Sequence, residues 1–128
     1  MVAAAPAHHL AAAALQRLSS QGPVAITRQI LREYLAVVTR PQSWAAPMPL
    51  PQALAQSEEI RQRFIVLEDG PDVWTQFRML ASRFNFGGKQ VHDANIVATM
   101  LAHGETRLLT FNAKDFQRFE PLIEIIAP

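Results

Sequence analysis

Three acidic residues have the types and the spacing to do chemistry together. Glu33, Asp93 and Asp115 each lie close to the start or end of a segment whose pattern indicates regular structure. Carboxylate oxygens are the ligands that Mg²⁺ and Mn²⁺ prefer, and these ions keep several waters when they bind. Ions held in this way can activate a water and neutralise charge on a phosphodiester. If the fold brings the three acids together, we expect an acidic metal site.

The rest of the sequence excludes several other hydrolytic sites. There is no cysteine, which removes thiol nucleophiles, disulfides and thiolate metal sites. The sequence contains no G-x-S-x-G motif, no H-E-x-x-H motif and no Walker loop. The acids are therefore the main candidates for catalysis.

The elements that must position these acids alternate between short apolar runs and helical patterns. Alternation of this kind predicts an α/β fold with a parallel sheet between helical layers. Such a sheet places its site at the carboxyl ends of the strands. The length of 128 residues suits one domain over residues 1–128. We predict strands at 24–26, 64–67, 107–110 and 122–126, helices over about 6–21, 28–40, 51–63, 71–86 and 92–103, and an irregular or short helical segment at 111–119.

Each acid also has a structural explanation. Glu33 can be a solvated helix residue, and Asp93 can stabilise the start of its helix through the macrodipole. Asp115 can cap a short helix, just as Thr27 can cap the helix that follows it. Because most acids in α/β domains are structural or solvated, spacing alone favours these roles. Reasoning from the residues ends at an α/β domain with a possible acidic site.

Composition sets wider limits on the class of protein. The chain is 49% hydrophobic and 18% charged, which suits a globular core. Its formal net charge of +1 is too small to indicate nucleic-acid binding by itself. No apolar stretch approaches the ~20 residues that cross a membrane, and the start lacks the basic residues of a secretory signal. We therefore expect a cytoplasmic protein.

Longer segments of the sequence resemble a known family. The segment VHDANIVATMLAHGETRLLTFNAKDF resembles the C-terminal half of PIN domains, especially VapC-like toxin ribonucleases. Its most specific feature is HDA followed at this spacing by TFN-x-x-DF. The segment VAITRQILREYLAVVTRP is similar to the family's second strand and glutamate-bearing helix, and IEIIAP resembles its last strand. The resemblance extends from about His8 onward.

Individual residues match the family's functional positions. Glu33, Asp93 and Asp115 match three acidic metal-site positions, and Asn112 and Thr110 match polar residues beside the last acid. Asn112 is also a common turn former, and Thr110 could simply end its strand.

Three basic residues flank the expected site and could contact RNA phosphates. They are Arg28, Lys89 and Lys114, and ordinary solvated roles are about as common for such residues. His92 is expected to be a polar residue at a helix start, since hard cations prefer oxygen. The aromatic residues Trp44, Trp74 and Phe77 are expected in the core or a dimer contact.

The resemblance implies a fold and a function. It implies a three-layer α/β/α PIN-like fold and an endoribonuclease that depends on Mg²⁺ or Mn²⁺. A metal-activated water would hydrolyse the RNA phosphodiester. The protein would be the toxin of a type II toxin–antitoxin pair, forming a homodimer and inhibited by an antitoxin whose tail covers the acidic site.

The chain departs from the family at its start. PIN domains of this kind begin with a central apolar strand that ends in a metal-site aspartate, whereas this chain has no acid before Glu33. We expect the first strand to be missing, which would leave strands 24–26 and 107–110 without their shared neighbour. A start assigned too far downstream, a truncation, or another segment that fills the gap, for example by exchange between subunits, would each explain this, and the first two explanations are favoured. Metal binding and activity should then be weakened.

Two further functions stay open at this point. The chain could be a catalytically impaired PIN remnant that binds RNA or antitoxin without cutting, which the missing acid favours. It could also be an unrelated α/β domain, although the sequence offers no acidic or glycine-rich first loop of its own.

Overall fold

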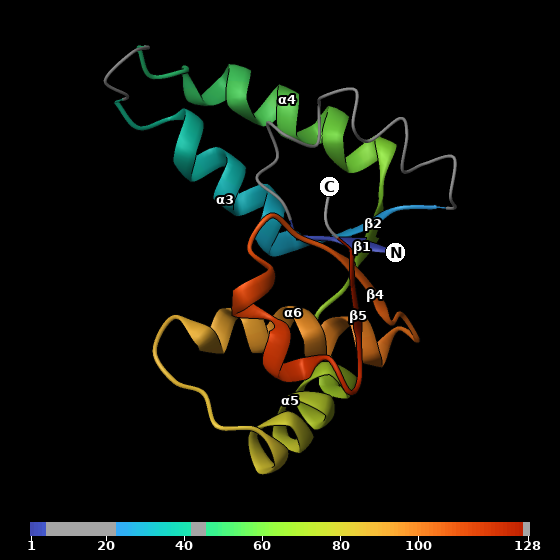
Figure 1. Cartoon of the computed structure of the whole chain (residues 1–128). Helices are drawn as coiled ribbons and strands as arrows, with labels where there is room; N and C mark the ends of the chain where they lie inside the picture. The colour runs from blue at the N-terminus through green and yellow to red at the C-terminus, as the bar shows by residue number, and fades with distance from the viewer. Residues whose placement is uncertain (5–22, 42–45, 127–128) are drawn as a thin grey trace.

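The fold is a five-stranded parallel sheet between two helical layers (Figure 1). The computed structural model describes residues 1–4, 23–41 and 46–126. Helices α3 (Arg28–Val38) and α4 (Leu50–Arg63) cover one face of the sheet, and α5 (Pro71–Arg83) and α6 (Gln90–Ala102) cover the other. The expected three-layer α/β/α architecture is confirmed. The strands run in the order β3-β2-β1-β4-β5, with bounds β1 Val2–Ala3, β2 Ala25–Thr27, β3 Ile65–Leu67, β4 Arg107–Leu109 and β5 Glu124–Ile126.

The centre of the sheet is formed by β1, so the prediction of a missing central strand is wrong. In this strand Val2 lies opposite Ala25 of β2 and opposite Leu108 of β4, both in parallel register. The Ala25 amide donates to the Met1 carbonyl at 2.8 Å, and the Ala4 amide donates to the Leu109 carbonyl at 2.9 Å. Strands β2 and β4 therefore have a shared neighbour from the same chain, and no exchange between subunits is needed.

Small apolar residues suit this central position because helices cover both faces of the sheet. Val2 and Ala3 are both 0% exposed. Val2 packs into the cluster that contains α5 and α6 residues, while Ala3 packs into the cluster that contains Ile30 and Tyr34 of α3. The sequence signal for this strand is weak, because alanine is depleted in strands and favours helices.

The two hydrophobic clusters use alternate residues of each strand, as a sheet buried on both faces requires. In β4, Leu108 belongs to the cluster on the α5–α6 side and Leu109 to the cluster on the α3–α4 side. The first cluster is completed by Phe119, which is 0% exposed and packs edge-on against Phe84 at 5.3 Å between ring centroids.

Helix α6, which carries one of the acids, ends as its sequence predicts. Gly104 follows it with a φ of +73°, a left-handed conformation that glycine adopts without strain. The Glu105 amide donates to the Met100 carbonyl at 2.8 Å and the Gly104 amide to the Leu101 carbonyl at 3.1 Å. This pair of bonds is the Schellman motif, which satisfies carbonyls at the helix end.

Other predicted elements are present with small shifts in their bounds. Strand β2 lies one residue later than predicted, and segment 111–119 forms two short 3₁₀ helices, η1 (Ala113–Asp115) and η2 (Gln117–Phe119). Thr27 holds the N-cap position of α3, but its side chain makes no capping hydrogen bond. The predicted helix 6–21 and Trp44 lie outside the described residues.

Two expectations about surface and membrane can be judged from the described residues. Trp74 is 62% exposed and stacks on Phe77 at 5.5 Å between ring centroids, so of its two expected roles the core is excluded, and a dimer contact stays a prediction. Within the described ranges, no helix combines the length and the apolar character that crossing a membrane requires.

We predict that Val2→Asp unfolds or strongly destabilises the protein. The change would place a charge at a fully buried position between β2 and β4, at a cost above about 4 kcal/mol. Urea denaturation of the purified variant measures the loss. Val91→Asp is the matched control, because Val91 is 39% exposed in the first turn of α6. Equal losses in the two variants would contradict the central placement of β1.

Candidate functional site

The three predicted acids line one cavity, which we call the acidic cavity. It has a volume of about 370 Å³, and Glu33, Asp93 and Asp115 reach it from three separate elements. It lies where β1 and β4 end, because Ala4 and Thr110 directly follow these strands and both line it. This is the edge at which a parallel sheet gathers its functional side chains. The remaining wall is formed by Gln29, Ile30, Lys89, His92, Ile96, Asn112 and Phe116.

The turn after β4 is held by its own polar groups. Thr110 is 2% exposed, and its hydroxyl accepts a hydrogen bond from the Asn112 amide at 3.0 Å. The Asn112 carbonyl in turn accepts from the Asp115 amide at 3.0 Å. The two polar residues predicted beside the last acid thus fix the backbone that carries Asp115.

Asp115 and Glu33 lie close enough to Asp93 to affect its pKa. Burial raises the pKa of Asp93 above its ordinary value of 3.8, and the negative charges of Asp115 and Glu33 raise it further. The positive charges of Arg118 and His92 act in the opposite direction on the same pKa. Burial is the largest cause of this net rise, and the charges of the neighbouring acids add to it.

The side chains differ in their freedom to move. Asp93 is half-buried in the first turn of α6, whereas Glu33 and Asp115 are exposed. Glu33 is oriented by Gln29, whose amide donates to its carboxylate at 2.9 Å one helical turn away.

The acids fit a hard cation in the chemistry of their donors, since all three offer carboxylate oxygens. They do not enclose such an ion as they stand. In the described part of the chain, no three histidine, aspartate or glutamate side chains form a group that could hold a metal ion. Binding would require the exposed carboxylates to turn inward.

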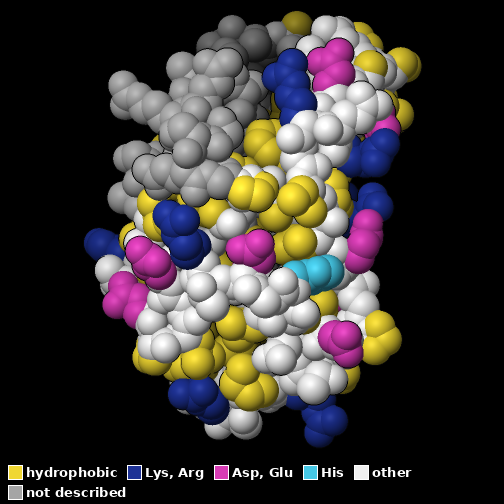
Figure 2. Space-filling view, turned by 90° about the vertical axis from the view of Figure 1, so that its right-hand side faces the viewer, with side chains coloured by type: hydrophobic (Ala, Val, Ile, Leu, Met, Phe, Trp, Pro, Cys, Tyr) yellow, Lys and Arg dark blue, Asp and Glu magenta, His cyan; other side chains and the backbone are white. Residues whose placement is uncertain are grey.

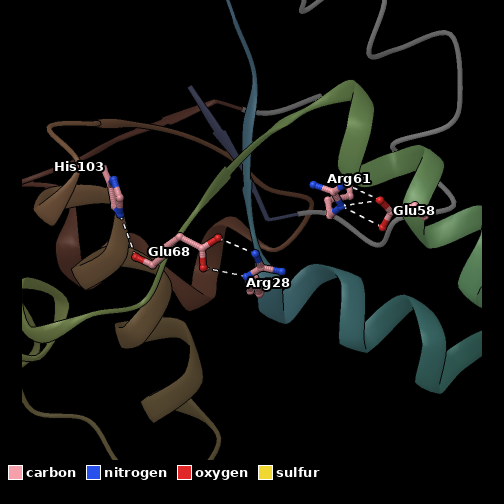
Figure 3. A network of polar contacts seen from close by, with 5 residues as sticks. All are labelled: Arg28, Glu58, Arg61, Glu68 and His103. Carbon is pink, nitrogen blue, oxygen red and sulfur yellow. Dashed lines mark hydrogen bonds and ion pairs between the residues drawn. The ribbon is translucent and has the colours of Figure 1, made fainter.

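The predicted RNA-contacting basic residues do not share one place. Lys89 lines the acidic cavity. Lys114 is exposed in η1 beside Asp115 but is not on the cavity wall. Arg28 lines a different cavity, and its guanidinium pairs with both carboxylate oxygens of Glu68 at 2.6 and 2.7 Å (Figure 3).

The face of the molecule on the right-hand side of Figure 1 has, among its described residues, no cluster of basic side chains that could contact RNA in place of these three residues. Figure 2 shows that face, where the drawn lysine and arginine side chains are separated by acidic and hydrophobic ones. The described residues of this face therefore form no continuous basic patch.

Gln29 and Ala4 line the acidic cavity and Arg118 acts on the pKa of Asp93, and none of them was predicted as functional. Gln29 lies four residues before Glu33, the spacing at which helical side chains meet. Arg118 lies three residues after Asp115 and donates to the Asn85 carbonyl at 3.1 Å. Ala4 carries no signal, because one alanine within an alanine-rich start looks like any other.

Comparisons of the sequence with known proteins are consistent with this arrangement. The family model described as PIN domain matches residues 1–120. The chain is 31% identical over 120 residues to Ribonuclease VapC48 of Mycobacterium tuberculosis, which covers 91% of this chain and 82% of that protein. It is 27% identical over 116 residues to Ribonuclease VapC24 of the same organism, covering 89% and 79%.

Solved structures with the same fold include two VapBC assemblies. VapBC-1 from nontypeable Haemophilus influenzae matches with a TM-score of 0.70 and 17% identity, covering 99% of this chain and 96% of that one. DNA-bound VapBC from Salmonella typhimurium matches with a TM-score of 0.71 and 16% identity, covering 98% and 96%. At these identities the likeness concerns the fold alone.

We predict that Asp93→Asn stabilises the folded protein at neutral pH. Because the folded state raises the pKa of Asp93, ionising this group costs stability as pH rises through the ordinary aspartate range and beyond. The gain in the variant should disappear below about pH 3, where Asp93 is protonated in both the folded and unfolded states. Thermal denaturation between about pH 3 and 8 measures it.

Asp72→Asn is the control for this prediction. Asp72 lies exposed in the first turn of α5, where the helix dipole favours a negative charge, so its removal should give no gain. A lower melting temperature for Asp93→Asn than for the parent at pH 7 would show that the negative charge at residue 93 is well tolerated.

Proposed function

Because this chain belongs to the PIN domain family, we propose that it is a metal-dependent endoribonuclease and the toxin of a type II toxin–antitoxin pair. Family membership excludes the alternative of an unrelated α/β domain. Support for the activity comes from the two relatives, which are both named ribonucleases. The fold agrees with that of the VapBC structures.

One observation carries the proposal: three carboxylates line the same cavity at the carboxyl ends of the two central strands. A phosphodiester approaching this cavity brings another negative charge. Like charges at such short range repel strongly unless a cation lies between them. An acidic cavity that accepts RNA therefore needs a metal ion, and Mg²⁺ or Mn²⁺ suits its oxygen ligands.

Glu33, Asp93 and Asp115 are the residues that would hold the ion. When bound, the ion supplies an activated water and neutralises charge on the phosphodiester. Thr110 and Asn112 hold the turn that presents Asp115, and Gln29 holds the Glu33 carboxylate.

The rest of the cavity wall would bind and place the RNA. Lys89 is the basic residue on that wall which would contact the RNA backbone. The half-buried position of Asp93 limits its contact with bulk water, which strengthens its attraction for a cation.

A second candidate function rests on Ala4. In the family the first strand ends in an acidic residue, and here Ala4 follows β1 on the wall of the acidic cavity. The site therefore has one carboxylate fewer than the family pattern. The alternative is a catalytically impaired PIN module that binds RNA or an antitoxin without cutting.

Partners follow from the same proposal. Besides RNA, we propose a cognate antitoxin protein and a homodimer, with the cytoplasm as the place of action. The two similar solved structures are VapBC assemblies, one of them with bound DNA, which supports an assembly with a second protein.

We predict that Asp93→Asn abolishes metal-dependent RNA cleavage while the protein remains folded. The change removes a carboxylate charge from the wall of the acidic cavity, and cleavage should fall by about 100-fold or more, since even residues that only support metal ligands are worth about 10- to 100-fold. Cleavage of a labelled RNA with Mn²⁺ or Mg²⁺, against EDTA, measures it. Asp72→Asn should cut like the parent. Parental cleavage by Asp93→Asn would reject this acid as a metal ligand.

We predict that Ala4→Asp strengthens metal binding. The new carboxylate would project from the end of β1 into the acidic cavity and increase the number of oxygen ligands there. Calorimetric titration with Mn²⁺ should show tighter binding, and the melting temperature should rise more steeply with Mn²⁺ concentration than in the parent. Ala55→Asp on the exposed surface of α4 is the matched control. Equal Mn²⁺ affinity in all three proteins would reject Ala4 as the vacant ligand position.

A further inference from the structure

A second cavity lies beside the acidic cavity at the same edge of the sheet. This polar cavity, of about 190 Å³, is built around Thr27 at the end of β2 and Leu67, Glu68 and Asp69 at the end of β3. Asn95 and Thr99 of α6 form its opposite wall. Gln29 and Ile96 line both cavities, so the two share a wall.

One buried hydroxyl on the wall of the polar cavity has no hydrogen-bond partner among the described residues. Thr27 is 6% exposed, and its hydroxyl has no hydrogen-bond partner among the described residues. It holds the N-cap position of α3 without capping it, and the first turn of α3 carries no acid. Unpaired buried hydroxyls are rare in native proteins, and a helix start presents further free amides. This side of the cavity therefore suits a ligand that accepts hydrogen bonds.

The rest of the polar cavity wall offers a hydrogen-bond acceptor and an apolar surface. The Asn95 side-chain amide donates to the Asp69 carboxylate at 3.1 Å, which fixes both groups. An ionised carboxylate has several lone pairs, so Asp69 can accept from a ligand as well. Leu67 and Ile96, which are 6% and 5% exposed, form apolar parts of the wall.

The charges around the polar cavity balance. Arg28 and Arg32 are positive, and Glu68 and Asp69 are negative. Figure 3 shows the Arg28–Glu68 pair with His103, whose ring nitrogen lies 2.9 Å from the Glu68 carbonyl, while Glu58 and Arg61 pair separately within α4. A balanced wall favours a neutral polar ligand over a phosphate or a charged side chain.

We propose that the polar cavity receives one nucleobase of the RNA strand, next to the phosphodiester that the acidic cavity holds. The inference rests on the proposed ribonuclease function. A nucleobase is neutral, has apolar faces, and carries hydrogen-bond donors and acceptors on its edge. Unpaired RNA bases are commonly turned out and read in this way. The volume suits one ring system, because it lies below the ~300 Å³ of drug-sized sites.

Three residues would select the base. Thr27 donates to an acceptor on the base edge, and Asp69 accepts from a neighbouring N–H group. Asn95 positions Asp69 through the hydrogen bond between their side chains. The matching pattern of donors and acceptors, more than size, would decide which base binds.

The first test uses binding without metal or cleavage. The four nucleoside 5′-monophosphates are titrated separately into the full chain in EDTA and followed by amide chemical shifts. At least one should bind at roughly millimolar concentration and shift the Thr27 and Asn95 amides. Thr27→Val and Asp69→Asn should weaken this binding about tenfold, and Asp72→Asn should not.

Thr27→Val keeps the shape of the side chain and removes a buried unpaired group, so the variant should fold at least as well as the parent. No binding by any nucleotide, or equal binding by all variants, would overturn the proposal. Shifts at the polar cavity caused by an arginine-containing peptide but by no nucleotide would also overturn it.

A second test separates this proposal from the ribonuclease function. Cleavage is compared on RNAs that differ at one nucleotide beside the cut. Asp69→Asn should change the relative rates among these RNAs, whereas Asp93→Asn should stop cleavage of all of them. If the parent binds a nucleotide but cleaves none of the RNAs, the base site is supported and the ribonuclease function is rejected. Cleavage with an unchanged base preference in Thr27→Val and Asp69→Asn would reject the base site alone.

Discussion

The parallel pairing of β1 with β2 and β4 is the interaction on which the rest of the structure depends. Its main-chain hydrogen bonds set the register of the three middle strands, so that β1 and β4 end together beside α3 and α6. Because all five strands point the same way, the residues that follow them gather at one edge. Both cavities lie at that edge. A strand of two small buried residues thus determines where the chemistry of the protein can occur.

The surroundings of Asp93 are the second constraint on the structure. Burial, and after it the negative charges of Asp115 and Glu33, raise the pKa of Asp93, so that ionising this group costs the folded protein stability. A fold tolerates such a cluster when other contacts hold its elements in place. Here the hydrophobic packing of α6 against the sheet, through residues such as Val97 and Met100, holds Asp93 at its position.

Much of this arrangement could be predicted from the sequence. The helical periodicity around α3 and α6 and the glycine after α6 are local signals, and they placed Glu33 and Asp93 on the correct elements. The catalytic roles of these acids remain predictions. Other features depend on contacts between distant parts of the chain. The alanine-rich start has no strand pattern, and only its neighbours make it a strand. Arg28 was expected near the acids, but its partner Glu68 lies 40 residues away and draws it to the other cavity. The unpaired hydroxyl of Thr27 likewise cannot be seen in a sequence, where a threonine before a helix indicates a cap.

The wall shared by the two cavities has a consequence for the geometry of cutting. Gln29 and Ile96 belong to the same two helices that carry Glu33 and Asp93, and an α-helix advances only about 1.5 Å per residue. The positions of Gln29 and Ile96 relative to Glu33 and Asp93 are therefore set by the helices, whereas Asp115 lies in η1 and the polar-cavity residues Glu68 and Asp69 follow β3. The two helices therefore hold the wall shared by the cavities at a fixed, short distance from Glu33 and Asp93. Under the two proposals above, an RNA strand lying along this edge would be cut close to the base that the polar cavity binds, at a distance limited by this shared wall.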